Sequence, residues 1–262
     1  MPMVAKTILA LSLLSTAAWA QGSEYVGVRE RAWRVTLTGE IRADSSLSNG
    51  TNIDVQDDFD FPAGELFHEV TVWVNVPLLP LRFNAGVWMG GFDESLSLQR
   101  TIDFGNQSFT AGTTVDASVE FRCYSLRGEF FLPTLGFNAV GISIGVELGV
   151  NYFTAEADVS SLGAAESKDV SGPLPVLGLH VIASITNWVR AELEITGIAS
   201  NYGPVHGHYI DAALEVVVAP IQYAFIGLGW KIIDMRVETS SDPIFDIDLR
   251  LSGPFLSIGI RF

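Results

Sequence analysis

The chain has 262 residues, of which 48% are hydrophobic and 17% charged, and its 30 acidic side chains outnumber the 15 basic ones. This apolar content excludes an intrinsically disordered chain, because disordered segments bury too little apolar surface to fold. The acidic balance argues against nucleic-acid binding, since no basic patch exists to contact phosphates. The single cysteine, Cys123, excludes a disulfide framework.

Residues 1–20 have the pattern of a secretory signal peptide. Lys6 precedes an apolar stretch over residues 8–18, and Ala18-Trp19-Ala20 supplies the small residues of a cleavage site. The apolar stretch is too short to span a bilayer, which takes about 20 residues. A buried N-terminal helix is the alternative interpretation. We therefore predict export and a mature chain that begins near Gln21, with a single domain over residues 21–262.

Alternation with period two continues along the mature chain, which favours strands with two different faces. The clearest case is Val140 to Tyr152, where seven apolar residues alternate with residues such as Gly141, Glu147 and Asn151. The pattern predicts about ten strands, although eight or twelve are also compatible with it. Their expected bounds are 32–43, 66–77, 81–95, 113–131, 139–159, 173–185, 188–200, 209–218, 222–238 and 247–262.

The connections between these strands differ in length in a regular way. Short turns are expected at 77–80, 133–138, 186–187 and 219–221. Longer polar loops are expected at 44–65, 96–112, 160–172, 201–208 and 239–246, and residues 21–30 are expected to form a tail. Short turns at one end and long loops at the other are typical of an antiparallel up-and-down transmembrane β-barrel. The alternative is a soluble periplasmic β-sandwich.

In three places the alternation slips by one residue, near 123–125, 232–233 and 253–254. A slip would turn every later side chain to the wrong face of the sheet. We therefore predict a β-bulge at each of the three positions.

The composition of the polar face favours a confined interior over a solvent-exposed surface. The chain has three lysines and twelve arginines, and the planar guanidinium group can satisfy carboxylates at close range. The residues predicted to form a polar lumen are Arg34, Glu40, Arg82, Glu120, Arg122, Glu147, Arg190, Glu192 and Glu194. Trp73, Trp88, Tyr124 and Phe225 share this interior phase. Aromatic residues near the strand ends predict girdles at both membrane interfaces. They are Trp33, Phe130, Phe131, Phe137, Trp188 and Tyr223 at the short-turn end, and Phe67, Phe92, Tyr152, Phe153, Tyr202, Tyr209 and Trp230 toward the loops.

The last strand ends in Leu256-Ser257-Ile258-Gly259-Ile260-Arg261-Phe262, an alternation that closes on an aromatic residue. Together with the signal peptide, this ending resembles the bacterial outer-membrane β-barrel superfamily. The resemblance implies that the barrel assembly machinery reads Leu256, Ile258, Ile260 and Phe262, and that the chain is inserted in the cell outer membrane of a Gram-negative envelope. It covers the architecture of the mature chain and includes no catalytic motif.

Three groups of residues are candidates for chemistry. His206 and His208 are two residues apart, so an extended backbone would point both toward one metal ion, with Asp211 just beyond; solvated loop histidines are the alternative. Asp54, Asp57, Asp58 and Asp60 crowd the first loop, where a solvated acidic loop competes with a calcium site. Arg190, Glu192 and Glu194 are expected beside His180, Asp211 and Glu215. Such a group could activate water, as in omptin-type proteases, or neutralise charge between strands.

Taken together, the sequence predicts an integral outer-membrane barrel without enzymatic activity, with a narrow or plugged lumen and acidic extracellular loops. A porin-like narrow channel for small solutes is one alternative, motivated by the glycine-lined strand at 141–149. A loop-end hydrolase that uses His206 or His208 is another. No cofactor is expected, the expected partners are outer-membrane lipids and the assembly machinery, and the oligomeric state is left open.

Overall fold

The computed structural model describes residues 25–44, 50–137, 140–202, 205–239 and 245–262. The predicted signal peptide, residues 1–20, lies outside this part of the chain. Among the described residues, no helix is long and apolar enough to cross a membrane. The fold consists of strands and their connections.

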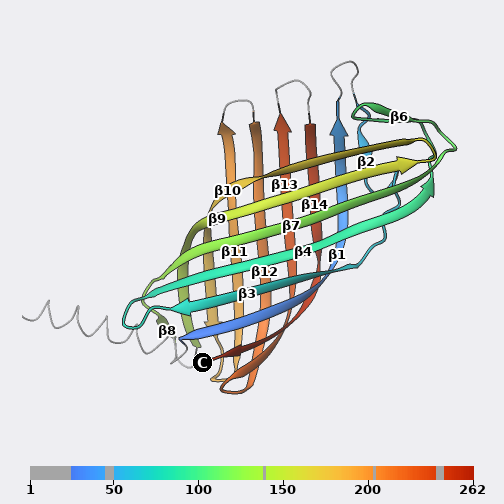
Figure 1. The fold of residues 1–262 in the computed structure, drawn as a ribbon. Coiled ribbons are helices and arrows are strands. Elements are labelled where there is room, and N and C mark those ends of the chain that lie inside the picture. Colours follow the sequence, from blue (N-terminus) through green and yellow to red (C-terminus); the bar gives the residue numbers. More distant parts are fainter. Residues whose placement is uncertain (1–24, 45–49, 138–139, 203–204, 240–244) are drawn as a thin grey trace, which may run out of the picture.

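Ten long strands close into one antiparallel barrel (Figure 1). Each strand pairs with its neighbour in the chain, and β1 closes the barrel against β14, where Val28 lies opposite Ile260. The fold class and the strand count that the sequence favoured are confirmed. The strands are β1 (Val26–Ala43), β3 (Glu65–Asn75), β4 (Leu81–Ser97), β7 (Thr114–Phe131), β9 (Val140–Ser161), β10 (Ala164–Ser184), β11 (Val189–Tyr202), β12 (Val205–Ile221), β13 (Ala224–Thr239) and β14 (Phe245–Arg261).

Two predicted loops and the predicted tail are instead strand. Residues 160–172 continue β9 and β10 up to a turn at Leu162 and Gly163, and most of 201–208 belongs to β11 and β12. Val26 to Glu30, expected in the tail, pairs with both β14 and β3. The sequence interpretation was wrong in the two loops because residues 160–172 and 201–208 carry mostly polar or small residues on both faces. In the tail, the alternation of Val26 and Val28 was not extended back from the predicted strand.

Four short strands complete the described fold. β2 (Ile53–Asp54) pairs with β1, β8 (Leu135–Phe137) pairs with β9, and β5 (Ile102–Phe104) and β6 (Gln107–Phe109) form a separate hairpin. The loops that carry β2, β5 and β6 bury apolar side chains in the main core. Val55, Phe59, Phe61, Ile102 and Phe109 are among them. These loops therefore form a packed cap at the loop end of the barrel.

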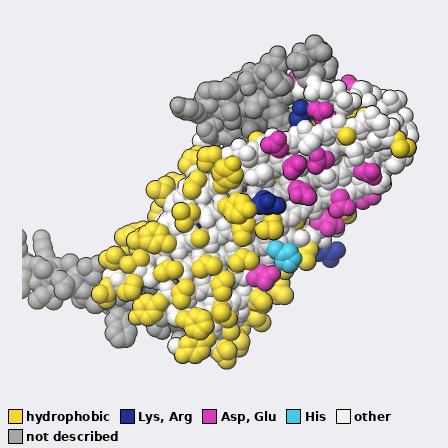
Figure 2. Space-filling model, in the orientation of Figure 1, with side chains coloured by type: hydrophobic (Ala, Val, Ile, Leu, Met, Phe, Trp, Pro, Cys, Tyr) yellow, Lys and Arg dark blue, Asp and Glu magenta, His cyan; other side chains and the backbone are white. Residues whose placement is uncertain are grey.

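The half of the barrel nearer the short turns carries an exposed apolar belt. Figure 2 shows it as a broad hydrophobic band on one side of the molecule. Its members come from all ten barrel strands and include Val26, Val72, Phe83, Leu126, Leu148, Leu179, Leu193, Leu214, Leu228 and Leu256, all of them exposed. A large exposed apolar surface of this kind suits contact with lipid.

Strand β7 shows that the two halves of the barrel have opposite polarity. Toward the loops, Val119 and Phe121 are buried inside while Glu120 and Arg122 face outward. Toward the short turns, Leu126 and Phe130 face outward while Arg127 and Glu129 face inward. The strand alternates without interruption, and only the surroundings of its two faces change.

The three predicted β-bulges were wrong for this reason. Pairing runs in constant register past Cys123, Ile232 and Gly253, with no residue inserted. Each position lies where the apolar residues change from the inner to the outer face. The register shift that the described ladders do show lies between Val218 and Ile221, beside the short turn joining β12 to β13.

Leu148→Arg should destabilise the barrel by about 2–4 kcal/mol, because it places a charge in the middle of the lipid-facing belt. Ser160→Arg is the matched control on the same strand and face, beyond the belt and opposite Asp116. Urea unfolding in lipid vesicles, followed by heat-modifiable gel migration, measures both. Equal stability of the two variants would contradict this placement of the belt.

Candidate functional site

A layer of charged side chains fills the barrel interior at the level of the apolar belt. It contains seven carboxylates, six Arg or Lys side chains and His180, so its charges balance when His180 is protonated. The members are Arg29, Arg31, Glu69, Arg82, Arg127, Glu129, Glu147, His180, Arg190, Glu192, Glu194, Asp211, Glu215 and Lys231. Every barrel strand except β14 supplies at least one of them, and Ser257 of β14 donates a hydrogen bond to Glu215. We call this set the ion-pair layer.

Arg29 and Arg31 of β1 each lie within ion-pair distance of three carboxylates. Arg29 Nη1 lies 3.1 Å from Glu192 Oε2 and 3.2 Å from Glu215 Oε2. Arg31 lies 2.9 Å from Glu69 and 3.1 Å from Glu215. The two arginines thus join β1 to β3, β11 and β12 across the barrel interior.

Lys231 and Arg127 neutralise carboxylates on the other walls. Lys231 Nζ is 2.6 Å from Glu69 Oε2 and 3.3 Å from Asp211 Oδ2. Arg127 Nη1 is 2.9 Å from Glu194 Oε1. Buried charges are tolerated when they are paired and hydrogen-bonded, so the layer stabilises the interior only as a connected set.

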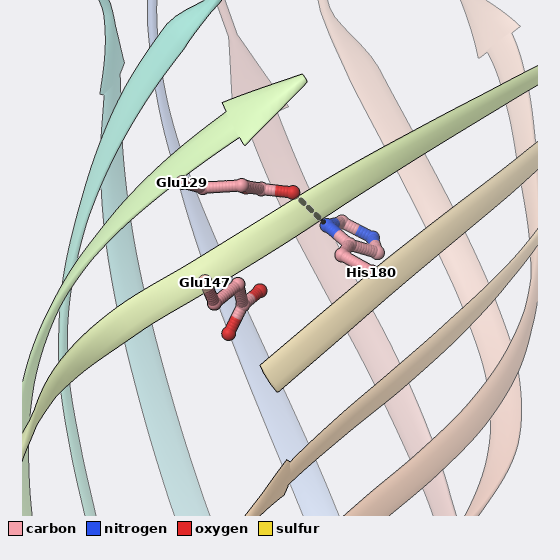
Figure 3. A group of neighbouring side chains, drawn as sticks. All are labelled: Glu129, Glu147 and His180. Atoms are coloured by element: carbon pink, nitrogen blue, oxygen red, sulfur yellow. Dashed lines mark hydrogen bonds and ion pairs between the residues drawn. The ribbon is translucent and has the colours of Figure 1, made fainter. Parts of the chain in front are cut away.

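Glu129, Glu147 and His180 form the part of the layer that could hold a metal ion (Figure 3). His180 Nδ1 is 2.7 Å from Glu129 Oε1, and one ligand atom from each residue lies within 4.8 Å of the others. Two carboxylates and an imidazole suit a divalent transition metal. However, Arg82 and Arg127 each lie 3.6 Å from one of the carboxylates. A cation here would have to compete with two guanidinium groups.

Apolar side chains pack inside the barrel on both sides of the ion-pair layer. Toward the loops, Trp33, Phe67, Trp88 and Phe121 are buried with their rings in mutual contact, for example 5.8 Å between the centroids of Trp33 and Phe67. Toward the short turns, Trp73 packs on Phe225, with Val217 beside them. The cavity among the charges has a volume of about 60 Å³, which is room for a few water molecules.

Two of the three glycines in 141–149, the segment that motivated the channel alternative, do not line open space. A Cβ added at Gly145 would overlap the Glu129 carboxylate, and one at Gly149 would overlap Arg127 and the backbone of Leu126. These glycines make room for charged side chains of β7 to lie across β9. The space that the missing side chains leave is therefore occupied.

The structure brings five of the nine predicted lumen residues into the ion-pair layer, Arg82, Glu147, Arg190, Glu192 and Glu194. It places the other four, Arg34, Glu40, Glu120 and Arg122, on the outer surface, where all are exposed. These four lie in the loop-end half, where the interior is apolar and the outer face is polar. Tyr124, also expected inside, is half exposed for the same reason.

The predicted aromatic girdles are present only in part. Phe130, Trp188 and Tyr223 are exposed near the short turns, and Tyr152 and Trp230 are exposed at the upper edge of the belt. The remaining aromatic residues predicted for the girdles whose burial is described, Trp33, Phe67, Phe92, Phe131, Phe153 and Tyr209, are buried inside the barrel. Strand-end position alone did not distinguish these two groups.

The candidate residues that the sequence placed in loops make contacts within the protein, and His208 lies in β12. His208 Nε2 lies 2.7 Å from Asp234 Oδ1, while the side chain of His206 is outside the described part. In the first loop, Arg100 Nε donates to Asp58 Oδ1 over 2.7 Å, and Asp54 accepts from the backbone N–H groups of Gln56 and Asp57. The hydrogen bond from Arg100 holds the pKa of Asp58 below its ordinary value.

Several members of the ion-pair layer were not predicted as site residues from the sequence. Arg29 was placed in a tail, and Arg31, Glu69, Arg127, Glu129 and Lys231 lie in apolar or mixed segments whose charged residues were not selected. His180, Asp211 and Glu215 were expected beside the Arg190–Glu194 segment and lie in the same layer. Extending the alternation of β1 back to Gly27 would have placed Arg29 and Arg31 on the face of Trp33.

No protein-family model matches the chain, and no curated protein sequence matches it. Among solved structures, the outer membrane protease OmpT of Escherichia coli is similar, with a TM-score of 0.57 and 8% identity over 92% of this chain and 98% of that one. The chain has the fold of a bacterial outer-membrane β-barrel protein. Ail of Yersinia pestis (TM-score 0.37, 10% identity, 91% of this chain and 99% of that one) and the toluene transporter TodX of Pseudomonas putida (0.30, 9%, 96% and 94%) are more distant.

The outer-membrane barrel fold and the exposed apolar belt together support the predicted location in the outer membrane. At 8% identity, the likeness to OmpT concerns the fold alone. The ion-pair layer of this outer-membrane barrel is therefore interpreted from its own geometry.

Glu215→Gln should lower the free energy of unfolding by about 3 kcal/mol, at the low end for removing one partner of a buried ion pair. Arg29 and Arg31 lose a shared carboxylate but keep Glu192 and Glu69. Asp248→Asn is the control, because the exposed Asp248–Arg236 pair at 3.8 Å contributes little. Denaturant unfolding of this outer-membrane barrel in micelles compares the two, and equal midpoints would contradict the structural role of the layer.

The Asp58–Arg100 contact in the cap of this outer-membrane barrel should weaken in acid. Because the folded-state pKa of Asp58 is lowered, its contribution is present above the ordinary aspartate value of about 3.9 and is lost as the pH falls through the lowered value. Carboxyl NMR titration in micelles should find Asp58 titrating below the ordinary value, and Arg100→Gln should move it upward. An unchanged titration midpoint of Asp58 in the Arg100→Gln variant would show that Arg100 does not lower the pKa of Asp58.

Proposed function

We propose that this protein is a closed, non-conducting outer-membrane barrel that presents a structured acidic surface outside the cell. The observation that carries the first part is the filled interior. From the short turns to the loops, the lumen holds an apolar seal, the ion-pair layer, an aromatic core and the packed cap. The cavity of about 60 Å³ within the charged layer is too small for a hydrated solute.

The acidic surface lies on the outward faces of β4, β7, β9 and β10 beyond the apolar belt. Glu120 lies directly opposite Glu156, which lies opposite Asp169, so three neighbouring strands carry a row of carboxylates. Asp93, Asp116 and Asp158 extend this surface, and Figure 2 shows acidic side chains gathered beyond the band. Like charges placed opposite one another repel, so a positively charged partner would reduce the repulsion among these carboxylates. This favours a basic protein segment as the partner.

Two other functions have less support. A narrow channel would need continuous space along the interior, whereas side chains of β7 occupy the surface of the glycine-rich strand. A loop-end hydrolase would need a histidine poised near an open site, whereas His208 is paired with Asp234.

We also propose that outer-membrane lipids surround the belt and that the assembly machinery reads the last strand. Leu256, Ile258, Ile260 and Phe262 are all exposed on the outer face. They are therefore accessible to a binding partner before they contact lipid.

Recording from planar bilayers tests the closed lumen. The purified protein should produce no stepwise conductance, while an open porin in the same lipid gives clear steps. Liposome swelling in small sugars is the parallel test for a narrow channel, and we expect no swelling above protein-free vesicles. Sustained conductance at the nanosiemens scale, or sugar-dependent swelling, would reject the proposal.

A further inference from the structure

The pairing between β10 and β11 ends well before the loop end of the barrel. Leu177 to Ser184 of β10 pairs with Arg190 to Gly197 of β11, and the remaining described residues of β10 pair with β9 alone. The last part of β11 likewise pairs with β12 alone. In Figure 1, the loop-end halves of β9 and β10 lean with β4 and β7, away from the more upright β11 to β13. The barrel wall therefore has a seam above the Leu177–Gly197 pair.

The sequence of β10 explains where this seam begins. Pro173 and Pro175 precede Leu177 by four and two residues, and proline has no backbone N–H to donate to a neighbouring strand. Proline is tolerated in sheets where the strand is an edge. The pairing of β10 with β9 continues past both prolines, so it is the β11 side of β10 that forms the edge.

A cavity of about 290 Å³ lies at the seam. Its walls are mainly the apolar side chains of Phe153, Val170, Leu174, Ile198, Met235 and Ile247. This volume is about twice that of a 150 Å³ apolar cavity, which stays dry and binds benzene. Residues of both faces of β10 contribute, since Pro173 faces outward and Leu174 inward. The cavity therefore reaches from the barrel interior into the seam.

The position of the cavity links it to the membrane. The seam starts beside Leu177 and Ile195, which are exposed members of the apolar belt. Its outer rim carries His208, paired with Asp234, and Arg236, paired with Asp248. An apolar chamber next to the lipid belt, with a charged rim above it, matches a molecule that has an apolar chain and a polar head.

We propose that this cavity, the seam chamber, binds one acyl chain of an amphiphile from the outer leaflet, entering sideways between β10 and β11. The chain would lie against Phe153, Leu174 and Met235, and the head group would stay at the rim near His208 and Arg236. Burying an acyl chain here replaces its contact with neighbouring lipid by close contact with protein side chains. The proposal is independent of whether the lumen conducts.

Photolabelling in vesicles tests the seam chamber. The protein is reconstituted in phospholipid that carries a diazirine in one acyl chain, irradiated, digested and mapped by mass spectrometry. We expect label on the inward-facing residues Phe153, Leu174 and Met235 in addition to the belt. Label on belt residues alone would overturn the proposal.

Gly172→Phe supplies the matched variant. Gly172 lines the chamber, and a Cβ added there meets no atom within 4 Å, so the phenyl ring can fill the space without disturbing the fold. We expect loss of the chamber label with the belt label unchanged. Gly136→Phe, whose Cβ is equally free in β8, is the control and should keep both. Chamber label that survives in Gly172→Phe contradicts the proposal.

A second probe distinguishes a ligand that comes from the membrane from one that comes from solution. A water-soluble aromatic diazirine is added to vesicles that contain unlabelled lipid. We expect weak chamber labelling, because lipid chains occupy the site. Chamber label from this probe with none from the photoreactive lipid would assign the chamber to a soluble apolar ligand and overturn the proposal.

Discussion

The need to neutralise charge inside a lipid-encircled barrel governs this structure. Seven carboxylates at the level of the belt are far from bulk water, where an unpaired charge would be costly. Each of the seven therefore lies within ion-pair distance of a cationic side chain, and the donors come from strands on opposite walls. This requirement draws long side chains across the interior and leaves little open space. The closed lumen that we propose would thus be a result of how the charges are satisfied.

The opposite polarity of the two halves follows from the same constraint. Where lipid surrounds the barrel, the outer face is apolar and the interior can be polar. Where the strands extend beyond the belt, water surrounds them, so the outer face carries Glu120 and Arg122 and the interior holds Phe121 and Phe153. The loop-end half is therefore organised like a soluble β-barrel joined to a membrane-spanning one.

Much of the fold could be predicted from the sequence, because period-two alternation is strong wherever one face meets lipid. The ten strands and their antiparallel order follow from it. The alternation does not say which medium each face meets, and so β7, β13 and β14 were assigned bulges and Arg34, Glu40, Glu120 and Arg122 were assigned to the lumen. Of the ion-pair layer, Arg82, Glu147 and the residues Arg190, Glu192 and Glu194 were predicted, because they lie on the polar face of clearly alternating strands. Arg29 was missed because residues 21–30 were interpreted as a tail. The partners of Arg29 and Glu69 include residues 163 and 162 positions away, which the sequence alone does not pair.

The pairing of the first strand, β1, with the last, β14, determines the order in which this protein can fold. Arg29 belongs to the first strand, but its acceptors Glu192 and Glu215 arrive only with β11 and β12. Such distant pairings form late, because the entropy of the long intervening segment must be lost before the contact can stabilise the fold. Until β14 meets β1, the incomplete sheet has an open edge and its charges can remain hydrated. Water is then excluded from the interior in the same step in which β14 pairs with β1 and closes the barrel. The final step of assembly is therefore cooperative.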